Sequence, residues 1–243
     1  MKAAFYSGVS GLVAYQEALN TIGNNVANVN TIGYKAQTTS FQDLLYTDMY
    51  VNTPENPLTG NGVKAVAVGI STGQAALIRT DRELDFAING DGWFAVERDG
   101  SIQYTRNGSF SVGMDGYMAA LVTSDGAYVL DSSGQRIYCD SSAVKEEFAP
   151  SVLCERLGVF EFANPEGLEP ASAASYVPTA ISGAATSTWG GSGKIISGFL
   201  EQSGVELTDE LSRMIAAQRA YQISARLIQV ADENEQTING LGK

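Results

Sequence analysis

Apolar residues recur at helical spacing at both ends of the chain. Over residues 4–28 they fall at alternating intervals of four and three, the pattern of a helix with one buried face. The stretch from residue 205 onward repeats this pattern more strongly. We therefore predict an amphipathic helix at each end, and pairing the two is the simplest way to cover both apolar stripes. The stripe positions, called the seams below, are Phe5, Val9, Leu12, Gln16, Leu19, Gly23 and Val26 in the first helix and Leu207, Leu211, Met214, Gln218, Tyr221, Ala225 and Ile228 in the second.

The start of the second helix carries its own signal. Thr208 is flanked by Glu206 and Glu210, and acidic groups favour the positive end of a helix dipole. We therefore expect the helix to begin close to Thr208.

The middle of the chain follows a different pattern, in which tight-turn dipeptides recur at nearly constant intervals. Their glycines are spaced 8, 8, 8, 10 and 8 residues apart. Asn-Gly and Asp-Gly supply the positive φ values of hairpin turns, and this interval leaves about five or six residues for each strand. We predict a β meander with turns at Asp91-Gly92, Asp99-Gly100, Asn107-Gly108, Asp115-Gly116, Asp125-Gly126 and Ser133-Gly134, and strands at 93–96, 102–105, 109–112 and 127–130.

Together these patterns predict an α+β fold in which the helical domain is discontinuous. Residues 1–30 and 205–243 would form the terminal helical domain, and residues 76–163 would form the β domain. The segments between them are rich in Asn, Thr, Ser, Gly and Pro, which is typical of connecting chain. We expect an extended outgoing connector over 31–75 and a return connector over 164–204.

The overall composition narrows the possible functions. The 243 residues carry a formal net charge of −12 and include no histidine. This acidity disfavours binding to nucleic acid and to anionic membrane surfaces. The commonest general base and metal ligand is missing. We therefore predict that the chain is not an enzyme and needs no cofactor or metal.

The two cysteines have two possible roles. Cys139 and Cys154 lie 15 residues apart, with neither a CxxC pair nor a histidine, so a zinc site is disfavoured. We favour two small buried hydrophobic side chains, because free cysteine commonly packs in this way. One disulfide outside the cytoplasm is the alternative.

Membrane insertion and a cleaved leader are both disfavoured. A membrane span needs about 20 consecutive apolar residues, and the chain contains no such run. The first 15 residues carry one lysine and are interrupted by serine and glycine, which makes a poor signal peptide. We expect any export to proceed without a cleaved signal.

Three other kinds of site are weaker than their structural explanations. Residues 81–92 are acidic but lack the spacing of a calcium loop, and hairpin turns explain them better. No pair among the 27 acidic residues stands out for a secreted glycosidase. Aromatic side chains on the strands favour a core over the ligand-binding face of a β-rich adhesin. These are Trp93, Phe94, Tyr104, Phe110, Tyr117 and Tyr128.

An asparagine-rich segment closes the first helix. Four asparagines fall within the seven positions 24–30. Asparagine is poor in helix interiors and good at helix ends, where its side chain bonds to backbone groups. Gly33 suits a reversal of the chain. Taken alone, these residues predict an unusual polar turn at the end of the helix and do not indicate a catalytic or binding activity.

This segment resembles the N-terminal signature of the flagellar rod and hook proteins. The likeness begins at Ser10-Gly11-Leu12 and Gln16 and continues through Asn24 to Lys35. Further blocks follow in the order of that family, and together they make a specific signal. The likeness is greatest to distal rod members, in length and at residues 41–46 and 60–63. The remaining blocks are residues 84–96, 104–110, 162–168, 198–203 and 214–221.

The resemblance implies a structural subunit of the bacterial flagellar basal body. Such a subunit polymerises into a hollow helical shaft, contacts neighbouring rod and hook subunits and an outer ring bushing, and leaves the cell through the flagellar type III export apparatus. We expect the terminal helices to order on assembly, because isolated helices are marginal in water. A proximal rod or hook subunit and a phage-tail-like tube subunit remain alternatives. The predicted assembly residues are Leu12, Gln16, Leu19, Asn24, Asn25, Asn28, Gly33, Tyr34, Leu207, Leu211, Met214, Gln218, Tyr221 and Ile228.

Overall fold

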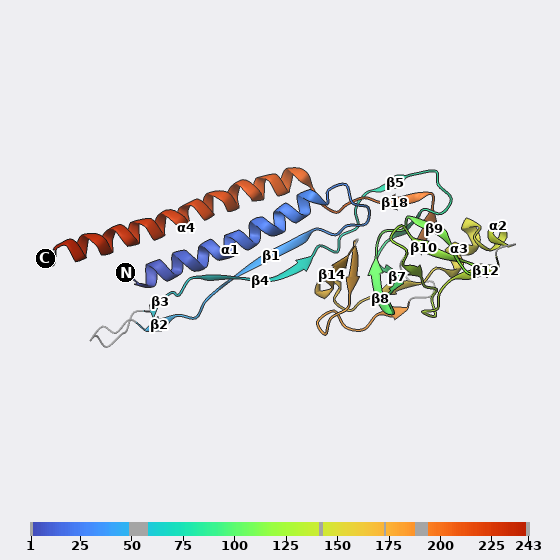
Figure 1. Cartoon of the computed structure of the whole chain (residues 1–243), viewed down its shortest axis with the longest axis horizontal. Helices are drawn as coiled ribbons and strands as arrows, with labels where there is room; N and C mark the ends of the chain where they lie inside the picture. The colour runs from blue at the N-terminus through green and yellow to red at the C-terminus, as the bar shows by residue number, and fades with distance from the viewer. Residues whose placement is uncertain (1, 49–57, 141–142, 173, 188–193, 242–243) are drawn as a thin grey trace. The chain divides into compact units, whose positions relative to one another are not determined.

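The chain folds into two compact units. The computed structural model describes residues 2–48, 58–140, 143–172, 174–187 and 194–241 (Figure 1). What we call the helical unit comprises Met1–Ala27, Gln37–Val68 and Glu206–Lys243, and what we call the β unit comprises Asn28–Ala36 and Gly69–Val205. The predicted α+β class, with helices at the ends and an antiparallel sheet between them in sequence, is confirmed.

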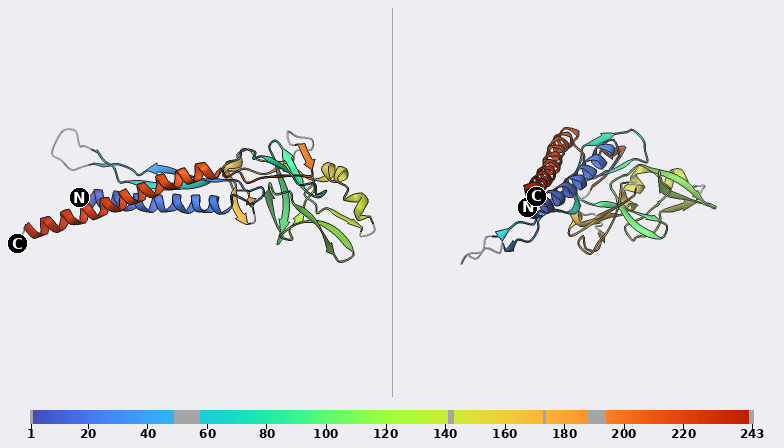
Figure 2. Two further views of the ribbon diagram at one scale, coloured as in Figure 1. Left: turned by 90° about the horizontal axis from the view of Figure 1, so that it is seen from above. Right: turned by 60° about the vertical axis from the view of Figure 1, so that its left-hand side comes forward.

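The two long helices pack side by side in the helical unit, as Figures 1 and 2 both show. α1 spans Lys2–Ala27 and α4 spans Leu207–Leu241, close to the predicted ranges, and their predicted pairing is confirmed. Part of the outgoing segment joins them, because α1 also contacts β1. The strands here are β1 (Gln37–Asp43), which pairs with β4 (Val63–Ile70), and β2 (Thr47–Asp48), which pairs with β3 (Leu58–Thr59).

One antiparallel sheet forms most of the β unit. Its strand order is β12-β10-β11-β7-β8-β15-β14, with β9 beside β10, β13 beside β7, and β16 beside β13. β6 pairs separately with β17, and β5 with β18. The strands are β5 (Leu77–Arg79), β6 (Phe86–Asn89), β7 (Trp93–Arg98), β8 (Ser101–Thr105), β9 (Phe110–Asp115), β10 (Met118–Thr123), β11 (Tyr128–Val129), β12 (Tyr138–Asp140), β13 (Val159–Glu161), β14 (Glu169–Ser172), β15 (Ser175–Val177), β16 (Thr186–Ser187), β17 (Lys194–Ser197) and β18 (Phe199–Glu201). The short helices are α2 (Val144–Glu147), α3 (Pro150–Arg156) and η1 (Pro165–Gly167).

Tight turns of the predicted kind connect several strands. Between β7 and β8, Asp99 and Gly100 have φ values of 51° and 77°, as a turn with two left-handed residues requires. The hairpins predicted at Asp91-Gly92 and Asn107-Gly108 are wrong, because β6 does not pair with β7 and β8 does not pair with β9. A Cβ added at Gly108 would lie 1.8 Å from the Phe86 carbonyl oxygen. This glycine therefore permits a close approach to β6.

β7 is buried on both faces and separates two hydrophobic clusters. Phe94 and Val96 lie in one cluster with Phe110, whereas Trp93 lies in the other with Tyr104. Because successive side chains of a strand point to opposite faces, this strand supplies both clusters in alternation. The preference for a core over a ligand-binding face is confirmed for these aromatic residues.

The other predicted aromatic positions differ. Tyr117 lies between β9 and β10 and is 93% exposed, so its assignment to the core is wrong. Tyr128 is half-buried, and its ring packs beneath the Arg136 guanidinium. Turn residues at a hairpin tip face solvent, whatever their hydrophobicity.

Both cysteines are free thiols that pack as hydrophobic side chains. Cys139 is buried in the Phe94 cluster, and the partly buried Cys154 packs against that cluster. Burial raises the pKa of both thiols. The favoured interpretation is confirmed, because both side chains contribute to the same apolar core.

Candidate assembly site

α1 meets α4 through a face of small residues. The buried positions of α1 begin with Gly8 and Gly11 and continue with two alanines. A Cβ added at Gly8 would lie 3.0 Å from Ile228 Cγ1, and one at Gly11 would lie 3.1 Å from Ser224 Oγ. The two helices therefore approach closely, which large side chains at these positions would prevent.

The seam predicted for α1 is not the face that packs against α4, which corrects our expectation. Leu12 and Leu19 are only half-buried, and Gln16 is exposed. Phe5 and Val9, on the same seam, are 39% and 37% exposed. The spacing of large apolar residues therefore predicted a stripe whose side chains stay partly exposed to solvent in the isolated subunit. A role of this seam in assembly remains a prediction.

The seam of α4 is only partly covered. Met214, Tyr221 and Ile228 are half-buried. Leu207 and Leu211 are 43% and 45% exposed, and Gln218 is exposed as well. The fully buried positions of this helix are Glu210, Ala217 and Ala231. The packed row is therefore rotated from the predicted one, and several large side chains face solvent.

The predicted side-chain bonding of the asparagine-rich segment is confirmed. The Asn25 side chain is buried, and its Nδ2 donates to the Gln37 carbonyl oxygen at 2.8 Å while its Oδ1 accepts from the Gln37 backbone N–H at 2.9 Å. This pair of bonds reproduces the exchange between two antiparallel strands. Asn24 donates to the Gln37 side chain at 3.3 Å. In the β unit, Asn28 accepts from the Thr31 hydroxyl at 3.1 Å.

The reversal at Gly33 lies inside the β unit. Gly33 has a φ of 68°, and its N–H donates to the Glu201 carbonyl oxygen at 2.9 Å. A Cβ at this glycine would lie 2.4 Å from the Asn107 backbone nitrogen, so both conformation and space require glycine. Tyr34 is buried and packs in a small cluster with Val205. Within the β unit, Gly33 and Tyr34 thus hold the segment after α1 against the segment that precedes α4.

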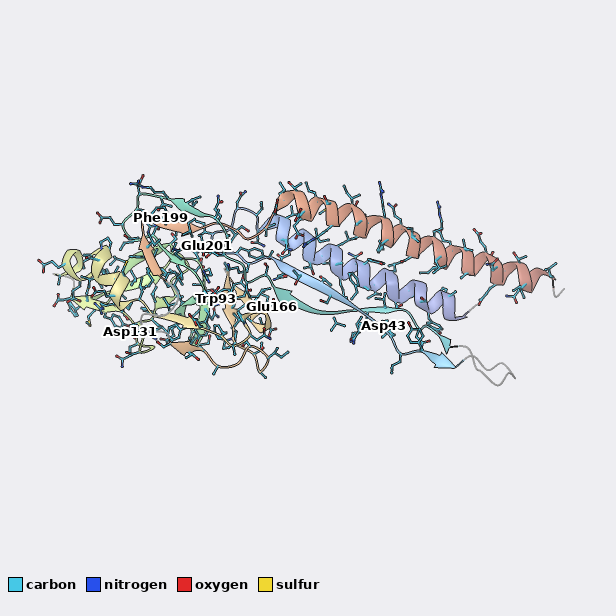
Figure 3. All side chains as sticks on the ribbon, turned by 180° about the vertical axis from the view of Figure 1, so that it is seen from behind. Asp43, Trp93, Asp131, Glu166, Phe199 and Glu201 are labelled. Atoms are coloured by element: carbon cyan, nitrogen blue, oxygen red, sulfur yellow. The ribbon has the colours of Figure 1, made fainter. Side chains whose placement is uncertain are left out.

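A buried ion cluster begins at Lys35, the next residue in the sequence, and includes Glu201, which Figure 3 labels together with Trp93. Lys35 Nζ lies 2.7 Å from Glu201 Oε1 and donates to the Gly73 carbonyl oxygen at 2.7 Å. Arg106 Nη1 lies 3.1 Å from Glu201 Oε2. The guanidinium carbon of Arg106 lies 5.5 Å from the centre of the Trp93 ring. Every charged side chain of the cluster is at most 2% exposed.

Burial dominates the electrostatics of this cluster. Desolvation lowers the pKa of Lys35 and of Arg106, and the charge of Glu201 opposes that shift for both. The Glu201 carboxylate therefore compensates both buried cations directly, and the charge of Asp91 adds a smaller contribution in the same direction. Sequence reasoning missed this cluster, because nothing in a single sequence distinguishes Glu201 from the other acidic residues.

A groove runs along the helical unit between α1, β1 and α4, with a volume of about 540 Å³. Most of its lining is alanine, isoleucine or aromatic, and Glu210 and Arg213 provide the charges. The lining residues are Tyr15, Ala18, Thr21, Ile22, Gln37, Thr38, Thr39, Phe41, Glu210, Arg213, Ala216, Ala217 and Ala220.

Within the described residues, the features that stand out are surfaces for packing. None of the described helices combines the length and apolar character needed to cross a membrane. Across the same residues, no three cysteine or carboxylate side chains gather as ligands for a metal ion. Exposed apolar rows, such as those on the two paired terminal helices, are typical of surfaces that bind other proteins.

The comparisons with known proteins place that architecture in a family. Three family models match: "Flagella basal body rod protein" over residues 5–35, "Flagellar hook protein FlgE/F/G D1 domain" over 87–150, and "Flagellar basal body rod FlgEFG protein C-terminal" over 196–241. The chain belongs to the flagellar basal-body rod proteins.

Individual relatives cover nearly the whole chain. Flagellar basal-body rod protein FlgG of Bacillus subtilis (strain 168) is 34% identical, over 96% of each chain. The protein of that name from Borreliella burgdorferi is 35% identical, again over 96% of each. Flagellar basal-body rod protein FlgF of Mesorhizobium japonicum is 29% identical over 100% of this chain and 99% of its own.

Proposed function

We propose that this chain is a distal-type rod subunit that polymerises into a hollow helical shaft through its two terminal helices. The observation that carries the proposal is the exposure of large apolar side chains on both helices. Val13 on α1 is 53% exposed, and Leu211 and Ile215 on α4 are 45% and 54% exposed. Because burying one such side chain fully contributes about 1.5–3 kcal/mol, a row of them favours association between copies.

Further parts of the proposal rest on the family. We propose that the subunit passes through the flagellar type III export apparatus and lies in the basal body, beyond the cytoplasmic membrane. Its neighbours are other rod subunits and the hook, and an outer ring encloses the shaft. Its role is mechanical rather than catalytic, and it needs no cofactor.

Deletion of the gene tests the proposal. The deletion strain should lack the distal rod and hook in electron micrographs of its basal bodies, and the full-length chain should restore both. A chain without residues 205–243 should be exported but leave the rod incomplete. Normal rods in the deletion strain, or with the shortened chain, would overturn the proposal.

A further inference from the structure

We propose that the groove of the helical unit receives α4 of a second copy of this chain, with Arg219 of that copy reaching Glu210. This inference rests on the proposed function and specifies one contact of the polymer. It follows from unpaired groups in the groove and from an exposed basic row on α4.

Two residues that line the groove each carry a buried polar atom without a hydrogen-bond partner. Glu210 is 3% exposed, and its Oε1 accepts from Arg213 Nη1 at 3.2 Å. Its Oε2 has no hydrogen-bond partner, and neither does the buried Thr39 Oγ1, which lines the same groove. A buried carboxylate oxygen without a donor is costly. The groove is therefore incomplete in the isolated subunit.

The residues that line the groove indicate what kind of side chain would fill it. Glu210 Oε2 is acceptor-only when ionised, so the incoming group must donate a hydrogen bond. The apolar side chains around it favour an occupant with an apolar stem. Arginine combines both properties, because its methylenes pack on apolar surface while its guanidinium donates in a fixed fork. A carboxylate can accept from two arginines, so Arg213 need not leave.

The helical unit presents such a side chain elsewhere on its surface. Arg219 is exposed and forms no ion pair with any described residue. Ile215 and Ile223 lie four residues before and after it and are 54% and 70% exposed. Positions separated by four residues lie along one side of a helix. The row Ile215-Arg219-Ile223 therefore matches an apolar groove that contains one unsatisfied acid.

The contact has the symmetry that a shaft needs. The groove and the Ile215-Arg219-Ile223 row are different patches, so each copy would offer one of each. Such a head-to-tail contact propagates into an open helical filament unless the rotation closes a ring. The inference therefore agrees with polymerisation and does not require a symmetric dimer.

Charge exchange in the deletion strain tests the pairing. Glu210→Arg and Arg219→Glu, each in the full-length chain, should reduce basal bodies with a distal rod about tenfold or more, as expected when one member of a desolvated charge pair is reversed. The double variant should restore them. Arg226→Glu is the matched control, since Arg226 lies two helical turns further on the same exposed side and should not rescue Glu210→Arg.

Cross-linking provides a measurement that does not depend on the fold of the Glu210 variant. In a chain with Cys139→Ala and Cys154→Ala, cysteines replacing Thr39 and Arg219 should form disulfides between copies in isolated basal bodies. Replacing Thr39 and Arg226 should yield at least tenfold fewer. Wild-type assembly of both charge variants, rescue by Arg226→Glu instead of Arg219→Glu, or equal cross-linking would overturn the inference. If the wild-type chain itself fails to restore rods, the proposed function fails instead.

Discussion

The Glu201 side chain forms ion pairs with both cations of a buried cluster, Lys35 and Arg106. The Glu201 carboxylate also accepts from the Ala75 backbone N–H at 3.0 Å. Converting this carboxylate into a neutral amide would remove the ion-pair partner of both cations in a desolvated site. At the residue scale, removing the Glu201 charge should therefore cost more stability than the accompanying loss of packing.

We predict that Glu201→Gln lowers the free energy of unfolding by about 3–5 kcal/mol, the usual cost of breaking a buried ion pair. Urea denaturation followed by tryptophan fluorescence measures this, because Trp93 lies next to Arg106. Glu166→Gln is the control, because Glu166 is exposed. Figure 3 labels this residue. A loss below about 1 kcal/mol, the value of an ordinary hydrogen bond, would contradict the prediction.

Tyr176 gives the β unit a dependence on alkaline pH. Its hydroxyl accepts from the Lys35 backbone N–H at 2.9 Å, and burial raises the pKa of Tyr176 above its usual value of 10.0. The folded state therefore retains a proton that the unfolded state loses above pH 10. Stability from this group is fully present below pH 10 and declines as the pH rises further. The decline with pH should be smaller in Tyr176→Phe, measured by urea denaturation between pH 9 and pH 11.

At the scale of elements, periodicity predicted that the two long helices exist and pair, but not which faces meet. The contact uses Gly8 and Gly11 on α1 and Ser224 and Ile228 on α4. A count of large apolar residues cannot detect such a contact, because close packing selects small side chains. The turns at Asp99-Gly100 were predictable because positive φ values demand these residues. Gly108 was misassigned because close backbone approach also requires glycine.

Two glycines of α1 should respond in opposite directions to substitution. Gly8→Leu would overpack the contact with Ile228 and should destabilise the chain by about 1–3 kcal/mol. Gly23→Ala should stabilise it by about 0.5–1 kcal/mol, because Gly23 is exposed with no atom within 4 Å of an added Cβ. Thermal unfolding followed by circular dichroism compares them. Equal effects would mean that the close helix contact does not form.

At the scale of the whole molecule, the chain passes between its two units after Ala27, Ala36, Val68 and Val205. The domain bounds set from the sequence, with the β domain at 76–163, differ from this division. Segment 28–36 belongs to the β unit although it follows the first helix directly. Local composition could not predict this, because Gly33 and Lys35 are held by partners such as Glu201 that are distant in sequence.

We predict that a fragment of residues 28–205 folds as a monomer, because it contains the whole β unit and both hydrophobic clusters. A fragment of residues 76–163 should not, because it lacks Lys35, Tyr176 and Glu201. Two-dimensional NMR spectra of both fragments test this. A dispersed spectrum from the shorter fragment would contradict this prediction and support the bounds predicted from the sequence.

The ion cluster also has a consequence for the order of folding. Lys35 and Glu201 are separated by 166 residues in the sequence, so their contact closes a very long loop. When the chain emerges with its N-terminus first, Lys35 and Arg106 appear long before Glu201. Burying either cation without this ion-pair partner is unfavourable. Long-range contacts also form slowly. The β unit should therefore remain incompletely folded until almost the entire polypeptide is available. Its folding is thus coupled to the emergence of nearly the whole chain.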